Sequence, residues 1–171
     1  IAASTGNTLQ ASDIAAGIQA NGISGITAAA KNEIRIPIKQ LKLDLPLSLK
    51  SGNASSFTEI KAVPTGLTSV QGLVDAINTK STASGVRAYL GDDGSVVLTN
   101  IAGSEGRDIA IDGAATPNAL GMKAGNYGGK ISITRALIAG TDTPIELGFA
   151  NGVATLGTAC TANHVRALMR Q

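Results

Sequence analysis

The single cysteine and the single histidine of the chain, Cys160 and His164, lie four residues apart. On a helix this spacing places two side chains on one face, where a thiol and an imidazole suit a nucleophile–base pair or two ligands of zinc. A zinc site needs further ligands, and the sequence offers no second cysteine or histidine. We therefore interpret His164 as a surface residue and Cys160 as a small buried or free thiol.

Three acidic residues, Glu105, Asp108 and Asp112, are close enough in the sequence to suggest paired carboxylates for general acid and base chemistry. Such pairs work when an apolar environment raises the pKa of one carboxyl group. Aromatic residues make up only 2% of the chain, so little is available here to shield a carboxyl group or to bind a sugar. We interpret these three residues as solvated.

Two glycine-containing segments resemble ligand loops only in part. Gly125 to Lys130 would need Ser or Thr after its Gly-Lys pair to bind phosphate, but Ile131 follows. Asp92-Asp93-Gly94 lacks the alternating acidic ligands of a calcium loop and instead predicts a hairpin turn. We therefore predict a structural protein and not an enzyme, with no catalytic residue, no metal and no cofactor.

The composition limits the fold and the partners. The chain has 171 residues, of which 43% are hydrophobic and 15% are charged, so its core is built from Ala, Val, Ile and Leu. A net charge of +2 is too small to indicate nucleic acid. No apolar run is long enough for a membrane span, and Ile1 to Asn7 does not resemble a signal peptide. We expect a piece of a longer protein, without a membrane or nucleic-acid partner.

An internal repeat is visible in the sequence. Each unit reads as a short helix with apolar residues at i and i+4, then a strand, a tight turn and a return strand. In the first unit these elements are Ser12–Ile18, Gly25–Ala28, Lys31-Asn32 and Glu33–Ile36; in the second they are Gln71–Ile77, Gly85–Ala88, Asp92–Gly94 and Ser95–Thr99. A third, partial copy has a strand at Pro144–Phe149 and a helix at Val165–Leu168. A capping box, Thr68-x-x-Gln71, starts the second helix.

Further strands are predicted outside the repeat. Residues 33–49 alternate apolar and polar side chains, with a change of parity at Lys39-Gln40 that predicts a bulge or a turn. Pro37 and Pro46 restrict this segment to edge strands or strand ends. Additional elements are a strand before the repeat's second helix at Phe57–Val63, a strand at Asp108–Ile111, a turn at Gly125–Gly129 and a strand at Ile131–Thr134.

These elements predict an α+β fold of small antiparallel sheets, with short helices packed on one face and repeated helix–strand–turn–strand units. We divide the chain into residues 1–50 with the first unit, 51–125 with the second, and 126–171 with the truncated third. The first unit lacks a leading strand and the third lacks a trailing hairpin. The two ends of the chain are therefore candidates for one combined lobe, with the middle inserted as another.

The second unit resembles the "IN" motif of flagellins, which is named for its Ile-Asn pair. The residues that carry the resemblance are Ile77, Asn78, Gly85, Val86, Asp93 and Gly94. The later segment Asn118–Gly125 is similar to one that often follows this motif in flagellins. The match covers about 65 residues, from Phe57 to Gly125. Gln19 in the first unit and the presence of Cys160 depart from the family pattern.

This resemblance implies a surface-exposed, variable outer domain of a bacterial flagellar filament protein, located outside the cell. Filament caps and hook-associated junction proteins contain the same motif and remain alternatives, as does an adhesin or phage-tail binding module. In that family, contacts with other flagellar subunits are made by long terminal heptad helices, which this sequence does not contain. We therefore expect such contacts through other parts of a parent chain, and a monomeric fragment.

Overall fold

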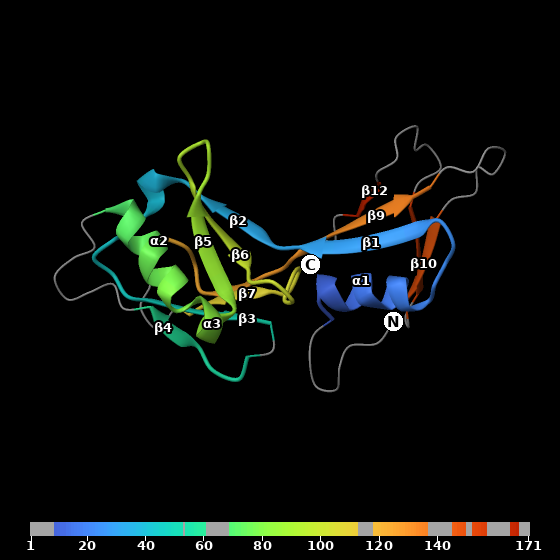
Figure 1. Cartoon of the computed structure of the whole chain (residues 1–171), viewed down its shortest axis with the longest axis horizontal. Coiled ribbons are helices and arrows are strands. Elements are labelled where there is room, and N and C mark those ends of the chain that lie inside the picture. Colours follow the sequence, from blue (N-terminus) through green and yellow to red (C-terminus); the bar gives the residue numbers. More distant parts are fainter. Residues whose placement is uncertain are drawn as a thin grey trace.

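A computed structural model describes residues 9–52, 54–60, 69–112, 118–136, 145–149, 152–156 and 165–167, with side chains placed as far as residue 136. The described part forms two lobes joined side by side along the long axis of the molecule (Figure 1). A larger lobe contains α2, α3 and strands β2 to β8, and a smaller lobe contains α1 with β1, β9 and β12. The α+β fold with small antiparallel sheets is confirmed.

Within the described residues, the helices are α1 (Ala11–Ala20), α2 (Val70–Thr79) and α3 (Ser81–Ser84), and a 3₁₀ turn spans Ile38–Gln40. The strands of the smaller lobe are β1 (Ile26–Lys31), β9 (Lys130–Arg135) and β12 (Val165–Ala167), in the sheet order β1-β9-β12. A separate hairpin pairs β10 (Ile145–Phe149) with β11 (Gly152–Leu156).

The larger lobe contains two sheets. One has the order β2-β6-β5, with β2 (Glu33–Ile36), β6 (Val96–Asn100) and β5 (Val86–Leu90). The other has the order β4-β3-β7-β8, with β4 (Thr58–Ile60), β3 (Leu47–Ser51), β7 (Ile109–Ile111) and β8 (Gly125–Tyr127). All strand pairs in both sheets are antiparallel.

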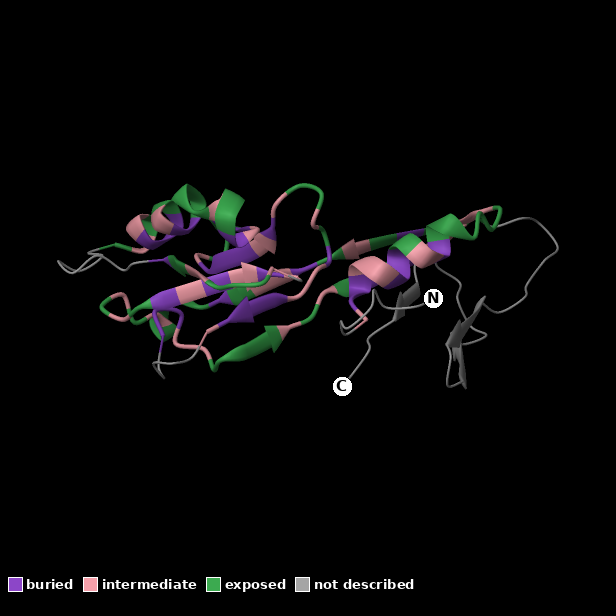
Figure 2. Ribbon diagram, turned by 90° about the horizontal axis from the view of Figure 1, so that it is seen from below, coloured by how far each residue is buried: buried purple, intermediate pink, exposed green. Residues whose placement is uncertain are grey.

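One aliphatic core holds the larger lobe together. Helix α2 contributes Leu73, Val74 and Ile77 from its apolar face, as its i, i+4 spacing predicts. Both sheets contribute alternate residues to the same core, and the segment before Gly121 adds Ala119 and Leu120. Figure 2 shows the resulting pattern for α2, in which the buried stripe of the helix faces the strands and its exposed side faces solvent.

A second, smaller core lies between α1 and the β1–β9 pair. It contains Ala11, Ile14, Ala15 and Ile18 of the helix, Ala28 of β1, and Ile131 and Ile133 of β9. The two cores do not coincide with the sequence division at residue 50, because Ile36, Leu47 and Leu49 belong to the larger one. The chain crosses from the smaller to the larger lobe near Asn32 and returns near Gly128.

Asn32 fixes this crossing point. Its side chain is 3% exposed and its Nδ2 donates to the carbonyl oxygens of Arg107, at 2.9 Å, and Tyr127, at 2.6 Å. Its own carbonyl accepts a hydrogen bond from the Thr99 hydroxyl at 2.8 Å. A buried amide that is satisfied in this way fixes the path of the backbone between the lobes.

Two local predictions are confirmed. The change of parity at Lys39-Gln40 corresponds to the 3₁₀ turn, and Pro37 and Pro46 stand immediately outside β2 and β3. The Asp92–Gly94 turn joins β5 to β6 in a hairpin, with the Gly91 N–H donating to the Ser95 carbonyl at 2.8 Å.

The predicted hairpin of the first unit is wrong. Strands β1 and β2 do not pair with each other; β1 pairs with β9 and β2 pairs with β6. A tight hairpin at Lys31-Asn32 would require positive φ angles, and only glycines adopt positive φ in the described part of the chain. The two strands instead form one extended run that passes from lobe to lobe (Figure 1).

Three smaller predictions also need correction. Residues 165–167 form a strand on the open edge of β9 rather than a helix, because a four-residue apolar pattern does not distinguish the two. Gly125–Tyr127 is strand β8 rather than part of a turn. Helix α2 is capped by Ser69, whose hydroxyl accepts from the Gly72 N–H at 3.1 Å, and Thr68 lies outside the described residues.

Candidate functional site

Four residues of the flagellin-like motif, Ile77, Asn78, Gly85 and Val86, gather around the junction between α2 and the β5–β6 hairpin. Ile77 and Val86 are both 0% exposed and lie in the larger core. Ile77 comes from the last full turn of the helix, and Val86 is the first residue of β5. These two motif positions therefore provide packing between helix and strand, and they present no reactive group.

Asn78 joins the helix to the strand by its amide. Its Nδ2 donates to the Ala88 carbonyl and its Oδ1 accepts from the Ala88 N–H, both at 2.9 Å. The side chain thus satisfies both backbone groups of one residue in β5. Because α2 and β5 are linked at this point as well as through the core, the angle between helix and hairpin is fixed.

Gly85 makes the sharp change from helix to strand. Its φ of +72° ends α3 in the left-handed conformation that favours glycine. A Cβ at this position would also lie 2.7 Å from Cβ of Ser51. The neighbouring Ser84 hydroxyl accepts from the Val86 N–H and donates to the Val86 carbonyl, both at 3.2 Å. The glycine is therefore required both by its backbone angle and by the close approach of β3.

Asp93 and Gly94 lie at the far end of the hairpin, away from the helix junction. The Asp93 carboxylate accepts hydrogen bonds from the Ser95 hydroxyl at 2.6 Å and the Ser95 N–H at 3.0 Å, and these bonds lower the pKa of Asp93. Gly94 has a φ of +74°. Together they close the turn. The motif residues thus belong to one supersecondary unit.

The first unit repeats half of this arrangement. Gln19, at the position equivalent to Asn78, donates from Nε2 to the carbonyl of Ala28 in β1. The Gly25 carbonyl accepts from Ala136 at 2.7 Å, as the Gly85 carbonyl accepts from Ile101 at 3.0 Å. The helix, glycine and strand are therefore repeated. The return strand is β9 in one unit and β6 in the other.

Asn118 organises the segment that follows the motif. Its Oδ1 accepts from the N–H groups of Leu120 and Met122, at 3.0 and 3.3 Å, and its Nδ2 donates to the Met122 carbonyl at 2.8 Å. Gly121 has a φ of +63°, and a Cβ there would lie 2.0 Å from the Gln40 carbonyl oxygen. The loop thus places Ala119 and Leu120, both 0% exposed, in the core.

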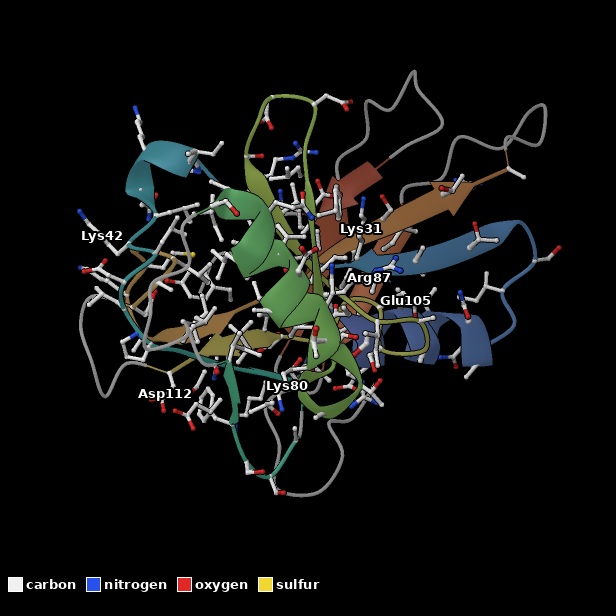
Figure 3. The ribbon with its side chains drawn as sticks, turned by 60° about the vertical axis from the view of Figure 1, so that its left-hand side comes forward. Lys31, Lys42, Lys80, Arg87, Glu105 and Asp112 are labelled. Carbon is white, nitrogen blue, oxygen red and sulfur yellow. The ribbon has the colours of Figure 1, made fainter. Side chains whose placement is uncertain are left out.

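Charged residues lie on the face of the β2-β6-β5 sheet opposite α2. The Glu33 carboxylate binds Nζ of Lys31 at 2.5 Å and the Arg35 guanidinium at 2.8 Å, and the hydrogen bond from Lys31 lowers the pKa of Glu33. Arg87 and Glu105 lie close together in Figure 3. The charges on this face are of both signs, and Glu33 pairs with both Lys31 and Arg35, which suits a solvated surface.

The carboxylates considered for catalysis have separate environments. Glu105 accepts from the Gly103 N–H at 3.1 Å, and backbone hydrogen bonds lower the pKa of Glu105. Asp112 lies well apart from Glu105 in Figure 3. Burial, followed by the charge of Asp13 from the smaller lobe, raises the pKa of Asp108. These three side chains therefore do not form the paired site that their spacing suggests.

Two further candidates from the sequence are the partial phosphate loop and the cysteine–histidine pair. Gly125 to Lys130 spans β8 and the start of β9, so its backbone forms strands and not a phosphate-binding loop before a helix. Cys160 and His164 lie outside the described residues. Among the residues that are described, no group of three or more His, Cys, Asp or Glu side chains is placed to hold a metal ion.

Replacing Asp108 by Asn is expected to stabilise the protein at neutral pH. Because the folded-state pKa of Asp108 is raised, the fold is most stable when this carboxyl group is protonated. Stability is lost as the pH rises from the ordinary Asp value through the folded-state pKa, and the variant removes that loss. Melting temperatures measured from acid to neutral pH would show a difference between variant and wild type that grows with pH.

The exposed Asp44→Asn variant makes the same change in net charge at a site remote in sequence. An equal, pH-independent shift in the Asp44 and Asp108 variants would contradict the assignment to burial at the lobe junction.

The sequence reasoning missed several buried polar residues. The sequence predicts a turn at Asn32, and the predicted elements do not identify the polar side chains of Ser51 and Asn100 as buried. Ser51 and Asn100 instead join the two sheets of the larger lobe, with Nδ2 of Asn100 donating to the Ser51 hydroxyl at 2.8 Å. Oδ1 of Asn100 is buried without a protein partner in the described part. The available signal was the break in apolar alternation at the end of β3 and β6.

No protein-family model matches the sequence, and a search of curated proteins finds no match. Within the described part of the chain, none of the helices is long and apolar enough to cross a membrane.

Proposed function

We propose that the chain is a surface-exposed outer domain of a flagellin-like filament protein and acts as a structural element without catalysis. The observation that supports this most directly is the unit formed by α2 and the β5–β6 hairpin. Each of the six residues of the resemblance has a role in its shape: Ile77 and Val86 pack, Asn78 joins helix to strand, Gly85 makes the turn into β5, and Asp93 and Gly94 close the hairpin turn.

The path of the chain supports an inserted, outward-facing lobe. The chain enters the larger lobe after β1 and leaves it into β9, and these two strands pair antiparallel. Entry and exit therefore lie side by side at the smaller lobe (Figure 1). An inserted domain that leaves and returns at one place extends a host structure without disturbing it.

The function that follows is surface display outside the cell, on the bacterial flagellum. Under this proposal the domain sets the outer shape, solubility and antigenicity of the filament. Contacts with other flagellar subunits are made by parts of the parent chain that this sequence does not include. The mixed and paired charges of Lys31, Glu33 and Arg35 suit a face that remains hydrated.

Immunogold electron microscopy of intact cells that produce the protein tests the proposal, with antibody raised against this chain. We expect gold along the whole filament. Gold only at the tip or at the hook junction would assign the domain to a cap or a junction protein instead. Gold absent from flagella would overturn the proposal and favour an adhesin or phage-tail module.

A further inference from the structure

Strand β5 ends its sheet, since the sheet order is β2-β6-β5. An edge strand exposes a row of backbone N–H and C=O groups that invite pairing with a strand from another molecule. The side chains of β5 add to this tendency, because Tyr89 is 40% and Leu90 is 44% exposed. The edge of β5 would therefore be a site of self-association if its backbone groups were free.

The hairpin register identifies the backbone groups that face outward. The Gly91 N–H donates to the Ser95 carbonyl, and the Gly85 carbonyl accepts from the Ile101 N–H. The odd-numbered residues from 85 to 91 therefore direct their backbone hydrogen bonds toward β6 and its flanking residues. In an antiparallel pair the alternate residues direct their N–H and C=O groups away from the partner. Within β5 these outward residues are Val86, Ala88 and Leu90.

Side chains from the preceding helices occupy the first two outward positions. The Ser84 hydroxyl bonds both the N–H and the carbonyl of Val86. The Asn78 amide bonds both the N–H and the carbonyl of Ala88. An amide side chain has both a donor group and an acceptor group, as the backbone of a residue in a neighbouring strand does.

We propose that Asn78, with Ser84, acts as a side-chain substitute for a neighbouring strand and closes the β5 edge to a second copy of this chain. In the first unit, Gln19 independently donates to the Ala28 carbonyl, an outward group at the edge of β1. A side-chain amide thus covers the corresponding edge residue in both repeats. This inference depends on the hydrogen bonds alone and holds whether or not the chain belongs to a flagellum.

Hydrogen exchange of the Asn78→Ala variant of the whole chain tests whether Asn78 closes the β5 edge. The Ala88 amide loses its acceptor and is expected to exchange about tenfold faster in the dilute protein, since one protein hydrogen bond is removed. The Arg87 and Tyr89 amides, which face β6, are expected to keep their protection. Equal acceleration of all three amides would show general destabilisation, and an unchanged Ala88 amide would remove the role of Asn78; either result overturns the proposal.

The Asn78→Asp variant separates the two halves of the contact. It keeps an acceptor for the Ala88 N–H but removes the donor to the Ala88 carbonyl. Protection of the Ala88 amide should therefore persist in this variant. If exchange at Ala88 in Asn78→Asp were as fast as in Asn78→Ala, the amide would not be held by the side-chain oxygen, and the proposal would fail.

Sedimentation analysis from micromolar to millimolar concentration tests the consequence for association. Asn78→Ala is expected to form a concentration-dependent dimer in which the Ala88 amide becomes protected again. Gln71→Ala, on the exposed side of the same helix, and Val74→Ala, which destabilises the core without touching the edge, are expected to stay monomeric. A monomeric Asn78→Ala at all concentrations, or a Val74→Ala that dimerises equally, would overturn the proposal.

Discussion

The Gly106→Ala variant is expected to lower the free energy of unfolding by roughly 2–5 kcal/mol. This value is the sum of the cost of placing a residue with a Cβ at a positive φ and the cost of steric overlap with its neighbours. Gly106 has a φ of +73°, which costs a residue with a Cβ about 1–2 kcal/mol. Its added methyl group would lie 2.2 Å from Cβ of Ala30 in β1. The overlap occurs between the two lobes, so the variant should also loosen their contact.

Gly103→Ala is the matched control for this measurement. Gly103 lies in the same loop with a φ of +82°, and a Cβ there meets nothing within 4 Å. It carries the backbone cost alone, so chemical denaturation should show a loss of about 1–2 kcal/mol. Equal losses in the two variants would mean that the loop and β1 do not pack as closely as the structure describes.

Local structure in the larger lobe is readable from the sequence because its signals are short-ranged. Leu73 and Ile77 are four residues apart, which defines the buried side of α2. Asp93-Gly94 defines the turn, since glycine reaches a positive φ at little cost. The helix and hairpin thus follow from neighbouring residues, and both formed where they were predicted.

Strand pairing over long distances is not readable in the same way. An alternating pattern predicts which face of β1 is buried, but it does not predict which strand pairs with β1. Lys31-Asn32 has no glycine in the place that Gly94 takes in the turn of the second unit. The buried Asn32 amide instead donates to two carbonyls of the other lobe. The pairing of β1 with β9 is decided by such tertiary contacts, which a single sequence does not display.

The candidate site was found by resemblance and not by chemistry. Asn78 stands beside a core isoleucine, and nothing in its neighbourhood indicates that its amide will reach Ala88, ten residues later. Ser84 and Gln19 act on strand edges in a related way, but a Ser or a Gln near a helix end has many other uses. Their roles depend on the crossing of helix and strand, which only the structure provides.

The Ile77→Ala variant is expected to destabilise the larger lobe by about 2–5 kcal/mol, because it leaves a cavity in a closely packed core. Ile77 is 0% exposed and belongs to the cluster that joins α2 to both sheets. The expected loss is a large share of the roughly 5–15 kcal/mol that stabilises an ordinary domain. Urea denaturation followed by circular dichroism gives the value directly.

Ile77→Val and Ile14→Ala show whether this loss arises in the larger core. Removing one methylene should cost only about 0.5–1.5 kcal/mol. Ile14 is 1% exposed but lies in the smaller core, so its truncation should speed hydrogen exchange in β1 and β9 more than in β5 and β6. The reverse pattern is expected for Ile77→Ala, because Ile77 lies in the larger core, to which β5 and β6 also contribute. If both alanine variants accelerated exchange equally in all four strands, the lobes would unfold as one cooperative unit despite their separate cores.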